Sequence, residues 1–237
     1  MTPHETVEIF GPIWWKWNII TFTTVAIVLY AGHKAQPHQK EFFAKIIGVV
    51  AIARWVLIHP IGIYMDNWNI QSNLPLQMCG FSSILGGVVL FWRKQIIYEF
   101  VFFMGISSAI HAFWTPEFTM GTRGYFFYDY YINHGCILLV PLYMTLILGY
   151  KPRVGGWWKA FLFAQVLLPP VAIANWLLDA NYMYMCQKPI ADNPFVIGEW
   201  PYYFLIIEAV GLMHYFLLYV PFGLKYYWNK EPIKSLV

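Results

Sequence analysis

A cysteine and a histidine, each within an apolar segment, are the residues of this chain best suited to covalent chemistry. Cys79 is predicted about two helical turns into a segment that begins near Leu74, and His134 at a similar depth in a later segment. A thiolate attacks acyl carbonyls, and a nearby imidazole can accept the thiol proton. Pro75 suits the first position of a helix, so Cys79 is expected near the positive end of the helix dipole, which favours a thiolate. We therefore predict Cys79 as a nucleophile and His134 as its general base.

The same residues also have structural interpretations. A free cysteine often packs as a small hydrophobic residue, and a single intramembrane histidine is usually a hydrogen-bonded packing residue. Cys136 lies two residues beyond His134 and so on another face of a helix, and we interpret it as a packing residue. Cys186 falls in a predicted outer loop. A disulfide from Cys186 to Cys79 would remove the nucleophile, but the expected depth of Cys79 argues against it.

The composition predicts the class of protein that must position these groups. The chain has 237 residues, of which 59% are hydrophobic and 11% are charged, whereas about 25% of residues are charged in an ordinary soluble domain. Seven apolar runs are long enough to cross a hydrocarbon core of about 30 Å as helices. They cover residues 12–31, 43–62, 74–92, 95–114, 127–148, 157–178 and 201–219. We therefore expect an all-α, polytopic membrane protein, a single domain over residues 1–237 with seven transmembrane helices.

The basic residues predict how these helices are oriented. Most of them fall after the first, third and fifth runs or in the C-terminal tail. These are Lys34, Lys40, Lys45, Arg93, Lys94, Lys151, Arg153, Lys159, Lys225, Lys230 and Lys234. Because cytoplasmic loops are enriched in Lys and Arg, the N-terminus is predicted outside and the C-terminus in the cytoplasm. The net charge of +3 therefore reports topology and does not indicate a nucleic-acid partner.

Several polar residues are predicted at a common depth in the outer half of the membrane. These are Arg54, His59, Cys79, His111, His134, Asn175 and Glu208. Ionisable residues within membrane spans usually face the bundle interior or a wet cavity. Glu208 is the expected protein partner of Arg54, and this pair would be a structural clamp unless Arg54 binds a phosphate. We find no phosphate-binding loop, dinucleotide motif or metal-ligand spacing, so no cofactor and no metal are expected.

A series of short motifs resembles one known family. They are Leu74-Pro75-Leu76-x-x-Cys79, Thr115-Pro116, Asn133-His134-Gly135, Asn181-Tyr182-Met183 with Lys188-Pro189, and Gly198-x-Trp200-Pro201. Their order and spacing, over about residues 70 to 222, resemble the YwaF-like integral membrane protein family. That family includes an animal transmembrane (TMEM-type) acyltransferase of ether phospholipids. The resemblance implies a catalytic Cys and His at Cys79 and His134, and the compact loops are more typical of members from a bacterial cell membrane.

These observations lead to one functional hypothesis. We predict a membrane-embedded acyltransferase that moves a fatty-acyl chain from a phospholipid to a lysophospholipid through a thioester on Cys79. The residues expected to bind substrate are Arg54, His111, Asn133, Asn181, Lys188 and Glu208. Of these, Arg54 or Lys188 would hold the lipid phosphate. Either the backbone N–H groups in the early turn of the third run or Asn133 would stabilise the oxyanion. The alternatives are a lipid hydrolase with the same dyad, a small-molecule transporter with a polar intramembrane site, and a non-enzymatic sensor or assembly factor.

Overall fold

The computed structural model describes residues 4–229, which are largely helical. Helix accounts for 71% of the structure and forms seven helices in the described part of the chain. Their bounds are α1 Pro12–Lys34, α2 Pro37–Tyr64, α3 Met78–Val89, α4 Gln95–Phe100 with η1 Val101–Gly105 and α5 Ile106–Trp114, α6 Gly124–Leu146, α7 Gly156–Leu178 and α8 Tyr202–Asn229. The short elements are β1 Glu5–Thr6, β2 Glu117–Phe118 and η2 Tyr182–Tyr184. Lys230 and Lys234, which support the predicted orientation, lie outside the described residues.

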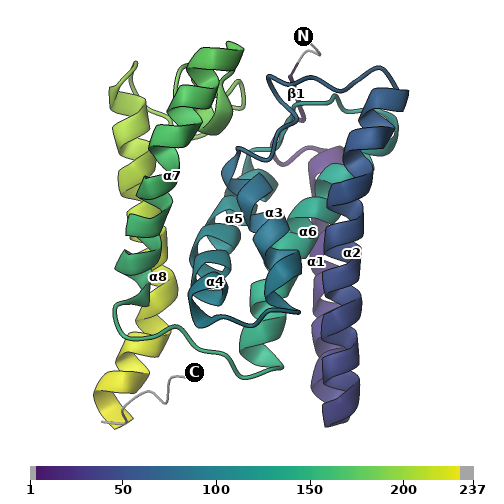
Figure 1. The fold of residues 1–237 in the computed structure, drawn as a ribbon, viewed down its shortest axis with the longest axis vertical. Helices are drawn as coiled ribbons and strands as arrows, with labels where there is room; N and C mark the ends of the chain where they lie inside the picture. Colours follow the sequence, from purple (N-terminus) through teal and green to yellow (C-terminus); the bar gives the residue numbers. More distant parts are fainter. Residues whose placement is uncertain (1–3, 230–237) are drawn as a thin grey trace.

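The helices form three groups (Figure 1). Helices α7 and α8 pack as a pair on one side, α1 and α2 lie on the other, and α3 to α6 fill the space between them. The segments α4, η1 and α5 run on as a single helix at the centre, and η1 is a π-helical turn whose residues are all buried. The central helices therefore supply the core, and the outer pairs shield it.

Four helices are long and apolar enough to cross a membrane. They are Pro37–Tyr64, Gln95–Trp114, Gly156–Leu178 and Tyr202–Trp228. The most apolar stretch of Gln95–Trp114 is 72% buried inside the protein, against 22% or less for the other three. One apolar helix is thus surrounded by protein, while the others present apolar side chains outward. This pattern is that of an integral, multi-pass membrane protein.

Helix α3 begins later than the sequence predicts. The expected run started at residue 74, but the helix starts at Met78, so the prediction that Cys79 lies two turns into a helix is wrong. The preceding residues are held by tertiary contacts instead, because the Leu74 N–H donates to the Tyr182 hydroxyl at 3.0 Å. A Cβ on Gly80 would lie 2.8 Å from the backbone of Pro75, so only glycine lets this segment fold back over the helix. Cys79 is consequently the second residue of α3.

Candidate functional site

A cavity of about 390 Å³ lies between the central helices and the outer loops. Its volume falls within the range typical of small-molecule sites. Residues from α2, α3, α5, α6 and α8 line it, and both Cys79 and His134 are among them. Two residues that lie far apart in the sequence therefore line one cavity, which a nucleophile and its base require.

The ring of His134 is held in one tautomer by its neighbour one turn earlier. Its Nδ1 lies 2.7 Å from the backbone carbonyl oxygen of Tyr130. Because a carbonyl only accepts hydrogen bonds, Nδ1 carries the proton and a neutral imidazole presents the Nε2 lone pair. The Tyr130 ring lies 4.2 Å from that of His134, and the Tyr130 hydroxyl donates to the Ala112 carbonyl at 2.8 Å. The side chain is buried, with 6% of its surface exposed, so its orientation is well determined by packing.

The thiol of Cys79 lies at the start of α3. The first N–H groups of a helix have no partner within the helix, so those of Cys79 and Gly80 point out of the first turn. Cys79 lines the cavity together with Ser108 and Tyr130. Tyr130 therefore lines the same cavity as both predicted members of the dyad.

The predicted pair of Arg54 and Glu208 is wrong. Arg54 donates from Nη1 to Asp129 Oδ2 at 2.5 Å and from Nη2 to Ser83 Oγ at 3.3 Å. Helix α6, which carries Asp129, packs against α2, whereas α8 lies on the far side of the central helices (Figure 1). Asp129 was not among the residues predicted from the sequence. It falls near the start of its apolar run, which covers residues 127–148. Arg54 and Asp129 line the cavity as a nearly buried ion pair.

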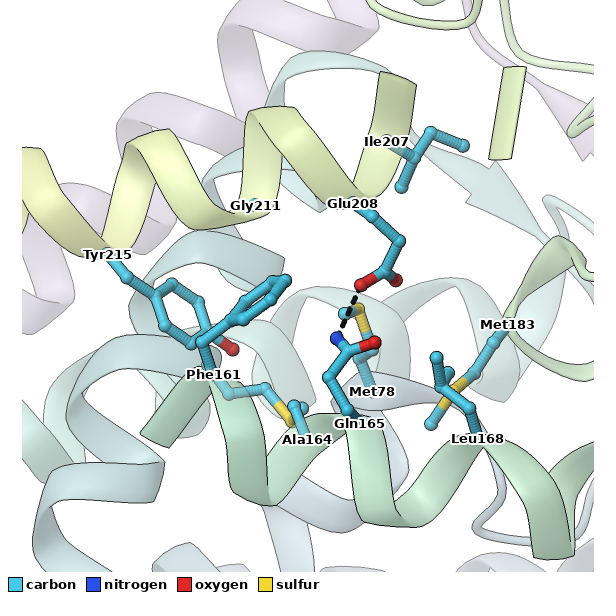
Figure 2. A pocket seen from close by; sticks show the side chains of 11 residues that line it. Met78, Phe161, Ala164, Gln165, Leu168, Met183, Ile207, Glu208, Gly211 and Tyr215 are labelled. Carbon is cyan, nitrogen blue, oxygen red and sulfur yellow. Dashed lines mark hydrogen bonds between the residues drawn. The ribbon is translucent and has the colours of Figure 1, made fainter. Parts of the chain in front are cut away.

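Glu208 faces a different space. It accepts a hydrogen bond from Gln165 Nε2 at 2.5 Å across the groove between α7 and α8 (Figure 2). Arg54 and Glu208 thus belong to two separate polar pairs. Of the residues on which the transporter alternative depended, Arg54, His59, His111 and His134 line the large cavity and Glu208 does not.

The structure brings together three of the six predicted substrate-binding residues. Arg54, His111 and Asn133 line the large cavity, while Asn181, Lys188 and Glu208 do not. Asn181 organises its own loop, since its Oδ1 accepts the N–H groups of Cys186 and Gln187 at 2.9 and 3.0 Å. The Lys188 ammonium pairs with Glu199 at the surface, at 2.7 Å. Both residues therefore stabilise the loop between α7 and α8, and neither lines the cavity.

Four buried side-chain atoms of cavity-lining residues find no hydrogen-bond partner within residues 4–229. They are Arg54 Nε, Ser107 Oγ, Asp129 Oδ1 and Asn133 Oδ1. A buried polar group without a partner costs about 1–3 kcal/mol, so such groups usually meet a ligand or water. One is a cationic donor, two are acceptors and the Ser107 hydroxyl can do either. Together they suit a ligand with both an anionic group and hydroxyl donors.

The sequence interpretation missed a polar cluster at the outer wall. Asn193 Nδ2 donates to Thr115 Oγ1 at 2.9 Å and contacts His111 Nδ1 at 3.4 Å. All three residues line the cavity: His111 and Thr115 lie one turn apart at the end of α5, and Asn193 comes from the loop between α7 and α8. His111 was already predicted to bind substrate and Thr115 belongs to a recognised motif, whereas nothing in the sequence marked Asn193.

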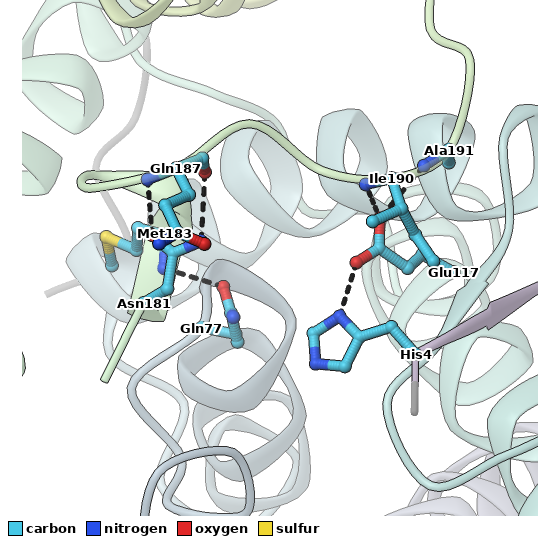
Figure 3. A network of polar contacts seen from close by, with 8 residues as sticks. All are labelled: His4, Gln77, Glu117, Asn181, Met183, Gln187, Ile190 and Ala191. Atoms are coloured by element: carbon cyan, nitrogen blue, oxygen red, sulfur yellow. Dashed lines mark hydrogen bonds and ion pairs between the residues drawn. The ribbon is translucent and has the colours of Figure 1, made fainter. Parts of the chain in front are cut away.

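Glu117, which lines the cavity, joins the N-terminal segment to the loop between α7 and α8 (Figure 3). Its carboxylate accepts hydrogen bonds from the N–H groups of Ile190 and Ala191 at 2.9 and 3.2 Å, and it pairs with His4 at 2.6 Å. Strand β1 pairs with β2 beside it. Glu5 accepts the hydroxyl and backbone N–H of Thr122, and these hydrogen bonds lower the pKa of Glu5.

A second loop contact carries backbone strain. Met183 and Tyr184 have positive φ angles of 57° and 52°, which non-glycine residues adopt only at a cost. Gln77, just before α3, accepts the Met183 N–H at 2.8 Å (Figure 3), and the Tyr203 hydroxyl donates to the Tyr184 carbonyl at 2.7 Å. Burial raises the pKa of Tyr184 well above its ordinary range, so its hydroxyl stays protonated. These hydrogen bonds hold the strained loop next to Gln77, which directly precedes Met78 and Cys79.

Replacing Tyr182 by phenylalanine should loosen this arrangement. The Tyr182 hydroxyl donates to the Ile70 carbonyl at 2.6 Å and accepts the Leu74 N–H. Without it both backbone groups lose a partner, so we expect a loss of about 2 kcal/mol in unfolding free energy. Thermal unfolding of the purified protein in detergent would measure it, with Tyr202→Phe, at an exposed tyrosine, as the control. Equal melting temperatures for Tyr182→Phe and wild type would contradict this role.

Within residues 4–229, the structure contains no disulfide and no group of side chains suited to bind a metal. Cys79, Cys136 and Cys186 are all free thiols, and Cys186 is exposed. Among residues 4–229, no three His, Cys, Asp or Glu side chains are grouped as a metal site would require. Gly135, next to His134, gives helix α1 room to approach, because a Cβ there would lie 3.0 Å from Thr21.

The apolar helices and the cavity with polar groups on its wall define the class of protein: an integral, multi-pass membrane protein with a candidate ligand site between its helices. The chain belongs to the TMEM164 family, whose sequence model matches residues 9–219. An uncharacterized protein of Treponema pallidum (strain Nichols) is 22% identical to it over 161 residues, which are 68% of this chain and 67% of the relative. No solved structure matches the chain.

Proposed function

We propose that this protein is a phospholipid acyltransferase in which Cys79 is the nucleophile and His134 the general base. One observation carries the proposal: both residues line the same cavity, and the bond from His134 Nδ1 to the Tyr130 carbonyl leaves Nε2 as a proton acceptor. The resemblance to YwaF-like proteins and to a TMEM-type acyltransferase of ether phospholipids supports the same two residues.

The proposed reaction has two halves. His134 Nε2 takes the proton of Cys79, and the thiolate attacks the ester carbonyl of a donor phospholipid. The C–O bond breaks, His134 returns the proton to the departing hydroxyl, and the acyl chain remains on Cys79 as a thioester. The hydroxyl of a lysophospholipid, deprotonated by His134, then attacks the thioester. This step forms a new ester and regenerates the thiol.

Neighbouring groups are suited to stabilise these steps. The N–H groups of Cys79 and Gly80 at the start of α3 can donate to the oxyanion, because they have no intrahelical partner. Arg54 keeps unpaired donor capacity at Nε and can hold the lipid phosphate. The unpaired Asn133 Oδ1 is an acceptor, so it suits the hydroxyl of the incoming lysophospholipid better than an oxyanion. This assignment revises the role that we predicted for Asn133 from the sequence.

Reconstituted protein can test the reaction directly. Proteoliposomes would contain a phospholipid with an isotopically labelled acyl chain and an unlabelled lysophospholipid. Transfer of label to the lysophospholipid, followed by mass spectrometry, supports the proposal. Release of labelled free fatty acid alone would instead identify a hydrolase that uses water as acceptor. If neither product forms, the dyad does not carry acyl chemistry on these lipids.

We also propose that the chain crosses a bacterial cell membrane seven times, with the N-terminus outside and the C-terminus in the cytoplasm. The 12-residue helix α3 is too short to cross alone, so its crossing includes the non-helical segment before it. Cys186 provides a test, because it is an exposed thiol in the loop between α7 and α8. A membrane-impermeant maleimide added to intact cells should label wild type but not Cys186→Ser. Labelling that requires permeabilised membranes would reverse the orientation.

A further inference from the structure

A second, smaller cavity shares a wall with the large one. It has a volume of about 20 Å³ and lies between α7 and α8 (Figure 2). Six residues line both spaces: Met78, Met104, Met183, Ile207, Gly211 and Tyr215. As it stands the smaller cavity has room for about one water molecule. The smaller cavity could therefore hold a larger group only if the wall that separates it from the large cavity moved.

This wall is apolar and deformable. Half of its residues are methionines, whose unbranched side chains adapt to different neighbours. Gly211 leaves a gap, since a Cβ built on it would meet no atom within 4 Å. Beyond the wall the smaller cavity is lined by Phe161, Ala164 and Leu168, and the hydrogen bond from Gln165 to Glu208 crosses it.

The wall also begins beside the proposed nucleophile. Met78 precedes Cys79 in the first turn of α3. The charged pair of Arg54 and Asp129 joins α2 to α6, on the other side of α3 from the α7–α8 pair (Figure 1). An ester carbonyl at Cys79 would thus have a polar region on one side and an apolar one on the other.

On the basis of the proposed function, we infer that this annex, the smaller cavity together with its shared wall, holds the acyl chain of the Cys79 thioester. The methionines move aside as the chain enters between α7 and α8, and the polar pair of Gln165 and Glu208 lies along its path. The substrate class is therefore a lipid with a long aliphatic acyl chain. Gly211 determines how much of that chain is admitted.

Acylation of Cys79 by activated esters of two lengths tests this inference. In purified full-length protein in detergent, the thiolate attacks the carbonyl of p-nitrophenyl butyrate or p-nitrophenyl palmitate. A thioester forms, p-nitrophenolate leaves, and the thiol proton passes to His134. The rate of p-nitrophenolate release is measured, and mass spectrometry locates the adduct. Gly211→Leu should slow acylation by the palmitate ester about tenfold, as expected when a few methylene groups lose their pocket, and leave the butyrate rate nearly unchanged.

Two further variants complete the test. Gly211→Ala should fit without a clash and give a smaller loss with palmitate, which guards against misfolding of the leucine variant. Ala209→Leu places the same side chain at an exposed position of α8 and should change neither rate. Equal losses with both esters, or no loss with palmitate, would overturn the acyl-chain annex while leaving the nucleophile intact. If wild type forms no Cys79 adduct with either ester, the proposed function itself fails and the annex with it.

Discussion

Replacing Cys79 by alanine is expected to reduce acyl transfer about 10³-fold or more, because the covalent intermediate can no longer form. Replacing His134 by alanine should have a comparable effect, since the thiol would lose the acceptor for its proton. The double variant should be little worse than either single one, because residues that act as a unit are not additive. Transfer of labelled acyl chains in proteoliposomes measures all three.

Matched controls separate chemistry from packing in this experiment. Cys79→Ser keeps the size of the side chain but removes the thiol, so it should also be inactive although it folds. Cys136→Ala removes a thiol two residues from His134 that does not line the cavity, and it should retain activity. Activity that survives in Cys79→Ala, or that is lost in Cys136→Ala, would contradict the assigned nucleophile.

Replacing Asp129 by alanine is expected to destabilise the fold by about 3 kcal/mol, because it leaves Arg54 as an uncompensated charge within the helix bundle. Only 10% of the Arg54 side chain and 9% of that of Asp129 are exposed. The double variant Arg54→Leu with Asp129→Leu should recover much of this loss, since it removes both charges. Unfolding in detergent, followed by tryptophan fluorescence, would measure these differences.

The surface pair of Lys188 and Glu199 provides the comparison. Glu199 is 85% exposed in this pair, so Glu199→Ala should change the unfolding free energy by less than about 1 kcal/mol. If Asp129→Ala is no more destabilising than Glu199→Ala, the ion pair in the cavity wall is not structural. If the double leucine variant is less stable than Asp129→Ala, the loss comes from packing and not from an unpaired charge.

The number and order of the helices could be predicted from the chain alone. Long apolar runs must form helices in a bilayer, because only a helix satisfies its own backbone groups there. All seven expected runs correspond to helices in the structure, and α7 ends at Leu178 as predicted. The ends were less predictable where other segments supply the hydrogen bonds. At α3, Tyr182 and Met183 hold the residues that hydropathy assigned to the helix.

The candidate site was only partly predictable, for a related reason. Depth in the membrane follows from counting residues along a helix, so Cys79, His134 and Arg54 could be placed at similar levels. Counting does not reveal which face of a helix meets which neighbour. Arg54 was therefore paired with Glu208 by depth, whereas the packing of α2 against α6 brings it to Asp129.

The sequence by itself determined an apolar, all-helical chain and singled out one thiol and one imidazole within it. Local composition decides these features, because hydropathy and helix length depend only on neighbours along the chain. The tertiary structure decided that Cys79 and His134 share a cavity, that the Tyr130 carbonyl selects the tautomer of His134, and that Glu208 belongs to a separate groove. These features depend on contacts between helices distant in sequence, whose rotation and crossing are set by packing of the whole bundle.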